Sequence, residues 1–225
     1  MKAILFDAST LITLAMNGLL EELINLRKIF NGKFIITEDV KREVIDKPLT
    51  IKRFELEALR LQQLLNDKVL EMSSVLGVDD AEISKRTKEM LELANTMFFG
   101  RGKDIYLISA GETSCLALSR ILDEKKIENI VCVDERTTRM LGEKPENLKK
   151  LLEKKLHIKI TLKKENFKFF EGFKFIRSSE LVYVAWKKKL VRLKNGQVLD
   201  ALLYAVKFKG CAISNDEIKE IKSLG

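Results

Sequence analysis

Histidine is almost absent from this chain, and other residues that commonly carry enzyme chemistry are also scarce. The single histidine, His157, stands among lysines and has no clustered partner for catalysis or metal binding. The cysteines Cys115, Cys132 and Cys211 are odd in number and lack CxxC spacing, which predicts buried thiols in a reducing compartment. No glycine-rich phosphate loop follows a predicted strand, which disfavours a dinucleotide-binding domain. Any catalysis would therefore depend on carboxylates and a bound cation.

Long apolar runs are missing, and prolines are few. The longest apolar runs, such as residues 130–133 and 181–186, are far shorter than the roughly 20 residues that span a bilayer. Residues 1–10 lack a signal-like hydrophobic region and cleavage site. With 225 residues, 46% apolar content and two prolines, the chain can bury a substantial core. We expect a soluble, cytoplasmic protein with no membrane partner.

The hydrophobic pattern predicts an α/β fold with a mainly parallel sheet. The apolar runs 2–7 and 33–37 have no helical period, and residues 11–29 between them do, so the three form a βαβ unit. Alternation over 157–175 predicts a hairpin. We expect a domain over 1–145, and a basic hairpin and helical extension over 146–225 packed on it. Further strands are expected at 69–72 and 129–133, and further helices at 38–45, 51–65, 79–98, 112–123, 145–155, 179–189, 197–208 and from 214.

Four carboxylates occupy positions that a parallel sheet would bring together. Asp7 and Asp134 end predicted strands, Glu112 lies in the first turn of a helix, and Glu43 lies near the start of another. In such sheets, ligand sites form beyond the carboxyl ends of the strands. Carboxylates gathered without a cation would repel one another and take up protons. The pattern therefore predicts a site for Mg²⁺ or Mn²⁺, ions that can activate water for phosphodiester hydrolysis.

Each of these carboxylates also has a purely structural interpretation. Asp7 and Asp134 can cap the helices that follow them, and Glu112 suits a helix N-terminus through the helix dipole. Glu43 can be a solvated helix residue. The joint placement of the four, rather than any one of them, favours the metal site.

Four short motifs occur in order along residues 1–142: FDAS at 6–9, ITEDV at 36–40 leading to Glu43, SAGE at 109–112 and DERTTR at 134–139. In this order and α/β context, the chain resembles the PIN-domain nucleases, in the branch with Asp-x-Ser, Gly-Glu and a later acidic pair followed by Arg. The resemblance implies a three-layer α/β/α sandwich around the sheet, with a basic C-terminal extension ending in helices. It also implies dependence on Mg²⁺ or Mn²⁺ and cleavage of single-stranded or structured RNA.

The resemblance also implies roles for individual residues. Asp7, Glu43, Glu112 and Asp134 would be catalytic metal ligands, directly or through water, and Glu135 would supplement them. Ser9 would orient Asp7 or a bound water, and Arg139 would pair with the acidic edge. A rival alignment remains open, in which Asp200 and Asp216 replace Glu112 and Asp134. Members of the family are often toxins held by an antitoxin, so a protein inhibitor and a homodimer are candidate partners beside RNA.

Positive charge is concentrated late in the chain. The net charge is +8, and residues 149–194 contain fifteen Lys or Arg against four Glu. Such a segment is expected to bind a phosphate backbone, and its interleaved phenylalanines either stack on bases or pack in the interior. The candidate RNA contacts are Lys163, Lys164, Lys168, Lys174, Arg177, Lys187 and Lys188.

The leading functional hypothesis is a metal-dependent endoribonuclease. A non-catalytic RNA-binding or assembly protein on a PIN-like fold is the alternative. A phosphatase of the haloacid dehalogenase type is disfavoured, because Ser9 stands where that chemistry expects a second aspartate.

Overall fold

A five-stranded sheet with entirely parallel pairing lies at the centre of the computed structural model, which describes residues 1–224. The strand order is β3-β2-β1-β6-β8, with β1 in the middle. Because β1 has neighbours on both edges and helices on both faces, its apolar run is buried almost throughout. The strands are β1 (Lys2–Phe6), β2 (Lys33–Ile36), β3 (Glu71–Met72), β6 (Glu128–Cys132) and β8 (Phe175–Ile176).

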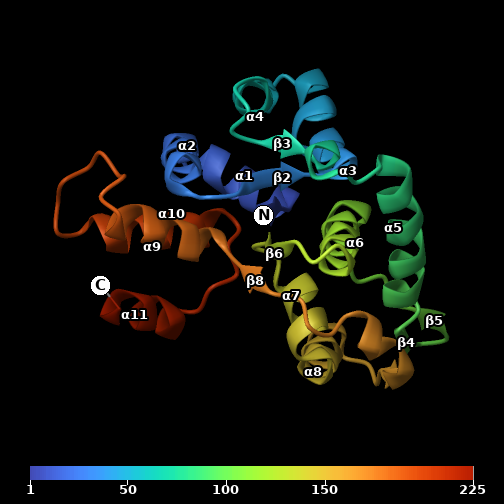
Figure 1. Cartoon of the computed structure of the whole chain (residues 1–225). Coiled ribbons are helices and arrows are strands. Elements are labelled where there is room, and N and C mark those ends of the chain that lie inside the picture. Colours follow the sequence, from blue (N-terminus) through green and yellow to red (C-terminus); the bar gives the residue numbers. More distant parts are fainter. Residues whose placement is uncertain (225) are drawn as a thin grey trace.

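Helices cover the sheet on both sides (Figure 1). Helices α1, α2, α9 and α10 gather on one side, and α5 packs against α6 on the other. Within residues 1–224, no helix has both the length and the apolar composition that crossing a membrane requires. The helices are α1 (Ala8–Met16), α2 (Leu20–Ile29), α3 (Glu38–Lys41), α4 (Glu55–Asn66), α5 (Asp80–Asn95), α6 (Ala110–Glu124), α7 (Arg136–Glu143), α8 (Pro145–Leu156), α9 (Ser178–Lys187), α10 (Val198–Lys209) and α11 (Asn215–Ser223).

The single helix expected over residues 11–29 is two helices. Helix α1 ends at Met16, and α2 begins at Leu20. Between them Gly18 has φ +69°, a left-handed conformation that glycine adopts without steric cost. The apolar spacing continues across this break because both helices bury one face in the same core.

The hairpin expected over residues 157–175 does not form. Strand β7 (Thr161–Leu162) pairs with β4 (Phe98–Gly100), which also pairs with β5 (Lys103–Asp104) in a second, antiparallel sheet. Strand β8 instead pairs with β6 at the edge of the central sheet. The alternating pattern arises because Ile160, Phe170 and Phe173 enter the core separately. The segment after residue 145 therefore supplies a strand of the central sheet.

The three cysteines are buried and unpaired, as their apolar surroundings predict. Burial, the largest cause, raises the pKa of the Cys115 and Cys132 thiols well above its usual range. A thiol that stays protonated is a poor nucleophile and a poor metal ligand. Within residues 1–224, cysteine therefore serves packing rather than chemistry.

Gly142 allows α7 to lie close to β8. A Cβ atom on Gly142 would come within 2.7 Å of the Phe175 ring and 3.2 Å of the Phe170 carbonyl oxygen. Alanine in a helix normally stabilises by about 0.5–1 kcal/mol relative to glycine. Here the clash is expected to outweigh that gain, and Gly142→Ala should lower the free energy of unfolding by about 1–3 kcal/mol in urea titrations.

Gly196→Ala is the matched control, because a Cβ there meets no atom within 4 Å. Its unfolding free energy should stay within about 0.5 kcal/mol of the wild type. A Gly142→Ala protein as stable as this control would contradict the close packing of α7 on β8.

Candidate acidic metal site

Asp7 lies directly after β1, at the point where the chain can move to either side of the sheet. From β1 the strands proceed to β2 and β3 on one side and to β6 and β8 on the other. Ligand crevices in open α/β sheets form beyond the carboxyl ends of the strands at such a switch point. Asp7 also caps α1, since its Oδ2 accepts hydrogen bonds from the Ser9 backbone N–H at 3.0 Å and from Ser9 Oγ at 2.5 Å.

The second carboxylate oxygen of Asp7 is the unusual atom of this site. Asp7 is only 2% exposed, and within residues 1–224 its Oδ1 is buried without a hydrogen-bond partner. Leaving a buried carboxylate oxygen unpaired is costly in free energy. An oxygen in this state can be satisfied by a cation, by a proton or by water.

Glu43 and Glu112 face the same pocket, which has a volume of about 380 Å³. Glu43 lies in a π-helical turn, Arg42–Asp46, that follows α3, and such turns often occur at functional sites. Its Oε2 approaches Gly111 so closely that a Cβ atom there would lie 2.7 Å away. Glycine at position 111 therefore allows Glu43 to reach the start of α6. This acidic pocket is lined by Asp7, Ser9, Ile12, Glu43, Ser109, Glu112, Glu135 and Gly210.

Burial and mutual repulsion raise the pKa of two of these carboxyls. The pKa of Asp7 rises from 3.8 to about 7, mainly through burial, with Glu112 and Glu43 adding to the rise and Ser9 opposing it. Burial also raises the pKa of Glu43, again with help from Glu112, while Lys47 lowers it. Near neutral pH, the cation-free pocket therefore holds Asp7 partly protonated.

Glu112 is held by its own helix and by α7. Its Oε2 accepts a hydrogen bond from the Ser109 backbone N–H at 2.7 Å, and its Oε1 accepts one from Thr138 Oγ1 at 2.5 Å. Ser109 Oγ in turn accepts from the Glu112 backbone N–H, which completes a capping box. The spacing Ser-x-x-Glu signals such a box in the sequence, whereas Thr138 had no such signal.

These residues fit a hard divalent cation only in part. Within residues 1–224, no group of three or more His, Cys, Asp or Glu side chains is gathered tightly enough to hold an ion. The unpaired Oδ1 of Asp7 and the neighbouring Glu43 nevertheless supply oxygen donors. Mg²⁺ binds through one or two carboxylates and keeps several of its waters. Asp7 and Glu43 would hold such an ion, and Glu112 and Glu135 face the same space.

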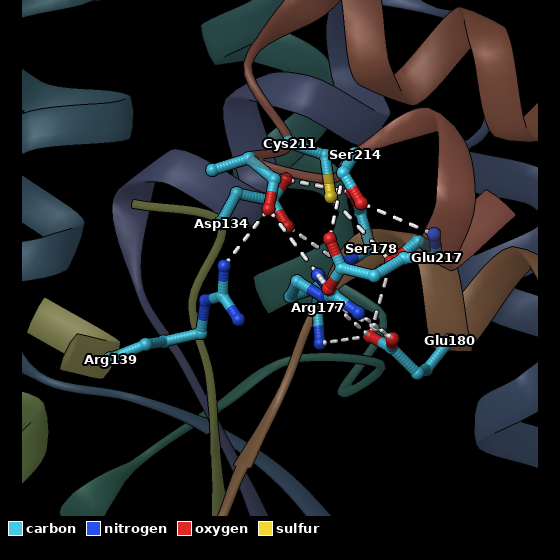
Figure 2. A network of polar contacts seen from close by, with 10 residues as sticks. Asp134, Arg139, Arg177, Ser178, Glu180, Cys211, Ser214 and Glu217 are labelled. Carbon is cyan, nitrogen blue, oxygen red and sulfur yellow. Dashed lines mark hydrogen bonds and ion pairs between the residues drawn. The ribbon is translucent and has the colours of Figure 1, made fainter. Parts of the chain in front are cut away.

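Asp134 is separate from the other three carboxylates. It is fully buried, its Oδ1 accepts from the Ser178 backbone N–H at 2.8 Å, and its Oδ2 accepts from Ser178 Oγ at 2.7 Å (Figure 2). Both oxygens therefore bind the first turn of α9 instead of facing the pocket. The role of Asp134 as a ligand stays a prediction, while its contacts give it a structural role at the start of α9, which lies beside the end of β6. Its backbone N–H still donates to Ser9 Oγ at 3.0 Å.

Arg177 also differs from expectation, since it is not free to contact RNA. Its buried guanidinium binds Glu180 at 2.6 Å and Glu217 at 2.6 Å (Figure 2). Burial opposes the charge of Arg177, but these partners outweigh it and raise the pKa of the guanidinium. Arg139 donates to the Ala212 carbonyl at 2.9 Å, and its Nε is buried without a partner within residues 1–224. Both arginines thus bind Ala212 in the loop before α11, and Arg177 also binds Glu217 in the first turn of that helix.

The rival carboxylates lie outside the acidic pocket. Asp200 of α10 forms an ion pair with Lys222, and Asp216 of α11 pairs with Lys219 at 2.9 Å. Glu135 does line the pocket, where its carboxylate accepts the Arg136 and Thr137 N–H groups at the start of α7. The structure therefore brings together Asp7, Glu43, Glu112 and Glu135.

The other candidate RNA contacts are exposed but do not form one patch. The residues before β8 lie near β4 and α8, whereas α9 packs on α2 and α10 (Figure 1). Among the interleaved phenylalanines, Phe170 and Phe173 are buried, so they serve packing. The exposed lysines are Lys163, Lys164, Lys168, Lys174, Lys187 and Lys188.

The pKa of Asp7 predicts how the stability of the cation-free protein depends on pH. Because the folded-state pKa of about 7 exceeds the ordinary 3.8, the folded protein binds more protons between these values. The contribution of Asp7 to stability is then complete below about pH 4 and lost as pH rises through 7. In chelator, the unfolding temperature should fall from pH 5 to pH 8, and Asp7→Asn should flatten this slope.

The difference in pKa corresponds to at most about 4 kcal/mol, at about 1.4 kcal/mol per pH unit. Asp216→Asn neutralises an exposed carboxylate and should leave the slope unchanged. An equal slope in Asp7→Asn and wild type would contradict the protonation of Asp7.

The contacts of Asp134 predict a loss of stability without a loss of cation affinity. Asp134→Ala leaves the Ser178 N–H and hydroxyl without their buried acceptor, and should lower the free energy of unfolding by about 2–4 kcal/mol. Asp134→Asn keeps one acceptor oxygen and should be milder. Calorimetric titration of Asp134→Asn with Mn²⁺ should match the wild type, and a loss equal to that of Asp7→Asn would show that Asp134 is a ligand.

Comparison of the chain with protein-family models, with curated proteins and with solved structures found no match. Any function proposed for the chain therefore rests on its own residues and on the geometry of the acidic pocket.

Proposed function

We propose that this chain is a metal-dependent endoribonuclease of the PIN type that hydrolyses RNA phosphodiester bonds at the acidic pocket. The observation that carries the proposal is the convergence of Asp7, Glu43 and Glu112 on one pocket at the carboxyl edge of the sheet. Burial, with their mutual repulsion adding to it, raises the pKa of Asp7 and Glu43, as expected of a functional site. A parallel sheet between layers of helices is compatible with the α/β/α architecture of such nucleases.

In the proposed hydrolysis, the residues of the pocket have different roles. Mg²⁺ or Mn²⁺ would stabilise negative charge on the phosphate and lower the pKa of a water molecule. Asp7 would help to hold the cation, because Ser9 donates to its Oδ2 and leaves Oδ1 without a hydrogen-bond partner in the described residues. Burial raises the pKa of Glu43, which would accept the proton of the attacking water.

The remaining carboxylates support this arrangement. Glu112 and Glu135 contribute negative charge from the starts of α6 and α7 and can bind waters that face the pocket. Asp134 is a positioning residue, since its backbone N–H holds the Ser9 hydroxyl that orients Asp7. The exposed lysines of residues 163–188 would contact RNA phosphates at a distance from the cleaved bond. We place this activity in the cytoplasm, where three unpaired cysteines remain reduced.

One observation favours a second function, a non-catalytic RNA-binding or assembly protein on the same fold. Both oxygens of Glu112 already accept hydrogen bonds, and within residues 1–224 no three carboxylates form a ready coordination shell. A protein of this kind would retain RNA without cutting it.

Cleavage of a fluorescently labelled single-stranded RNA distinguishes the two functions. The wild type should cut in Mn²⁺ and stop in EDTA. Asp7→Asn and Glu43→Gln should lower the cleavage rate by about 10²–10⁴-fold, because each removes a group that acts on the reacting water or its cation. Their thermal unfolding should show that both variants remain folded.

Asp216→Asn is the control, because it removes a carboxylate outside the pocket and should retain the wild-type rate. RNA binding by the wild type without cleavage in Mn²⁺ would favour the second function. Full activity of Asp7→Asn would overturn the proposed site.

A further inference from the structure

An apolar groove of about 500 Å³ lies beside the acidic pocket. Its walls come from α1 and from the segment that runs from the π-helical turn into α4. Ile12, Met16, Ile51 and Phe54 line it and remain 37–45% exposed. Large apolar side chains gathered in an open hollow of this size are typical of a ligand-binding surface.

The groove adjoins the acidic pocket. Ile12 and Glu43 line both cavities, so that a ligand in the groove lies next to the carboxylates. This adjacency links the occupant of the groove to the substrate of the pocket. A partner bound only through apolar contacts would gain no binding energy from the neighbouring carboxylates.

Two lysines and two glutamates also line the groove, so its charges balance: Lys47, Lys209, Glu43 and Glu57. Lys47 follows the π-helical turn and is near enough to lower the pKa of Glu43, which places it at the boundary between groove and pocket. Lys209 ends α10 and lines the groove, and its neighbour Gly210 lines the acidic pocket. The guanidinium of Arg53 lies 5.4 Å from the centroid of the Phe54 ring, which adds a third positive charge at the rim.

We propose that the groove binds one unpaired base of an RNA strand, next to the phosphodiester that reaches the acidic pocket. The base packs against Phe54, Ile51 and Ile12, and Lys47 and Lys209 contact the phosphates on either side of it. This inference rests on the proposed function for the identity of the strand. It selects single-stranded RNA, because a base held in a duplex cannot enter the groove.

The alternation of chemistry along this surface matches that of a nucleotide strand. Carboxylates with a cation suit a phosphate, the apolar walls suit the face of a base, and the lysines suit the neighbouring phosphates. An amphipathic protein helix would fill the apolar walls but would place side chains against the carboxylates. The lining residues shared by the groove and the acidic pocket therefore favour the RNA strand over a separate protein as the occupant.

Fluorescence anisotropy of labelled oligoribonucleotides in EDTA tests the proposal, since binding is then measured without cleavage. Phe54→Ala should weaken the binding of a single-stranded oligonucleotide about tenfold, because stacking a base on an aromatic ring contributes about 1–3 kcal/mol and 1.4 kcal/mol is tenfold. Ile51→Ser should also weaken it, and it serves as a second variant if Phe54→Ala loses its fold. The affinity for a duplex of the same sequence should not change.

Leu59→Ala is the matched control, because Leu59 is 52% exposed on α4 but lies outside the groove. Its affinity for both RNAs should equal that of the wild type. Single-strand binding that is absent in the wild type, or unchanged in Phe54→Ala and Ile51→Ser, would overturn the base site. The base site would also be overturned if these variants lost the binding of a protein partner and kept the binding of RNA.

Cleavage in Mn²⁺ separates this proposal from the proposed function. Weaker single-strand binding by Phe54→Ala, together with no cleavage by the wild type, would support the groove and refute the nuclease. Cleavage by the wild type with an unchanged KM in Phe54→Ala would support the nuclease and refute the groove.

Discussion

The hydroxyl of Ser9 joins the ends of the two strands on which the acidic pocket depends. It donates to Asp7 Oδ2 after β1 and accepts from the Asp134 backbone N–H after β6. Asp134 in turn binds the start of α9 through both carboxylate oxygens. A single hydroxyl therefore connects the orientation of the pocket carboxylate with the packing of the C-terminal helices.

The pocket keeps its carboxylates close at a cost in free energy. Burial and the charges of Glu112 and Glu43 raise the pKa of Asp7, and Asp7 Oδ1 is left without a partner in the described chain. Residues that held only a helix cap would not need this crowding, because a cap is satisfied by the Ser9 contacts alone. Crowding of this kind is typical of functional sites, where stability is lost in exchange for reactivity.

Glu112 shows how one carboxylate can cap a helix and also change the electrostatics of a pocket. Its hydrogen bonds to Ser109 and Thr138 fix the start of α6 and link it to α7. The same side chain raises the pKa of Asp7 and of Glu43. The structural and functional interpretations of this position in the sequence are therefore compatible. Asp134 also accepts hydrogen bonds through both oxygens, but both come from Ser178, and Asp134 does not line the pocket.

Strong local signals in the sequence were enough to predict the central strands β1, β2 and β6 and most helices. They also predicted that the cysteines are buried. These depend on periodicity and capping, which are properties of neighbouring residues. Three features depend on contacts between residues that are far apart in the sequence. Residues 157–175 supply strands to two different sheets, and Arg177 is buried between Glu180 and Glu217. The Asp134 side chain points to the start of α9 and not toward the Asp7 side chain. The direction of a side chain at the end of a strand depends on which distant helix packs beside it. A local sequence pattern does not encode that packing.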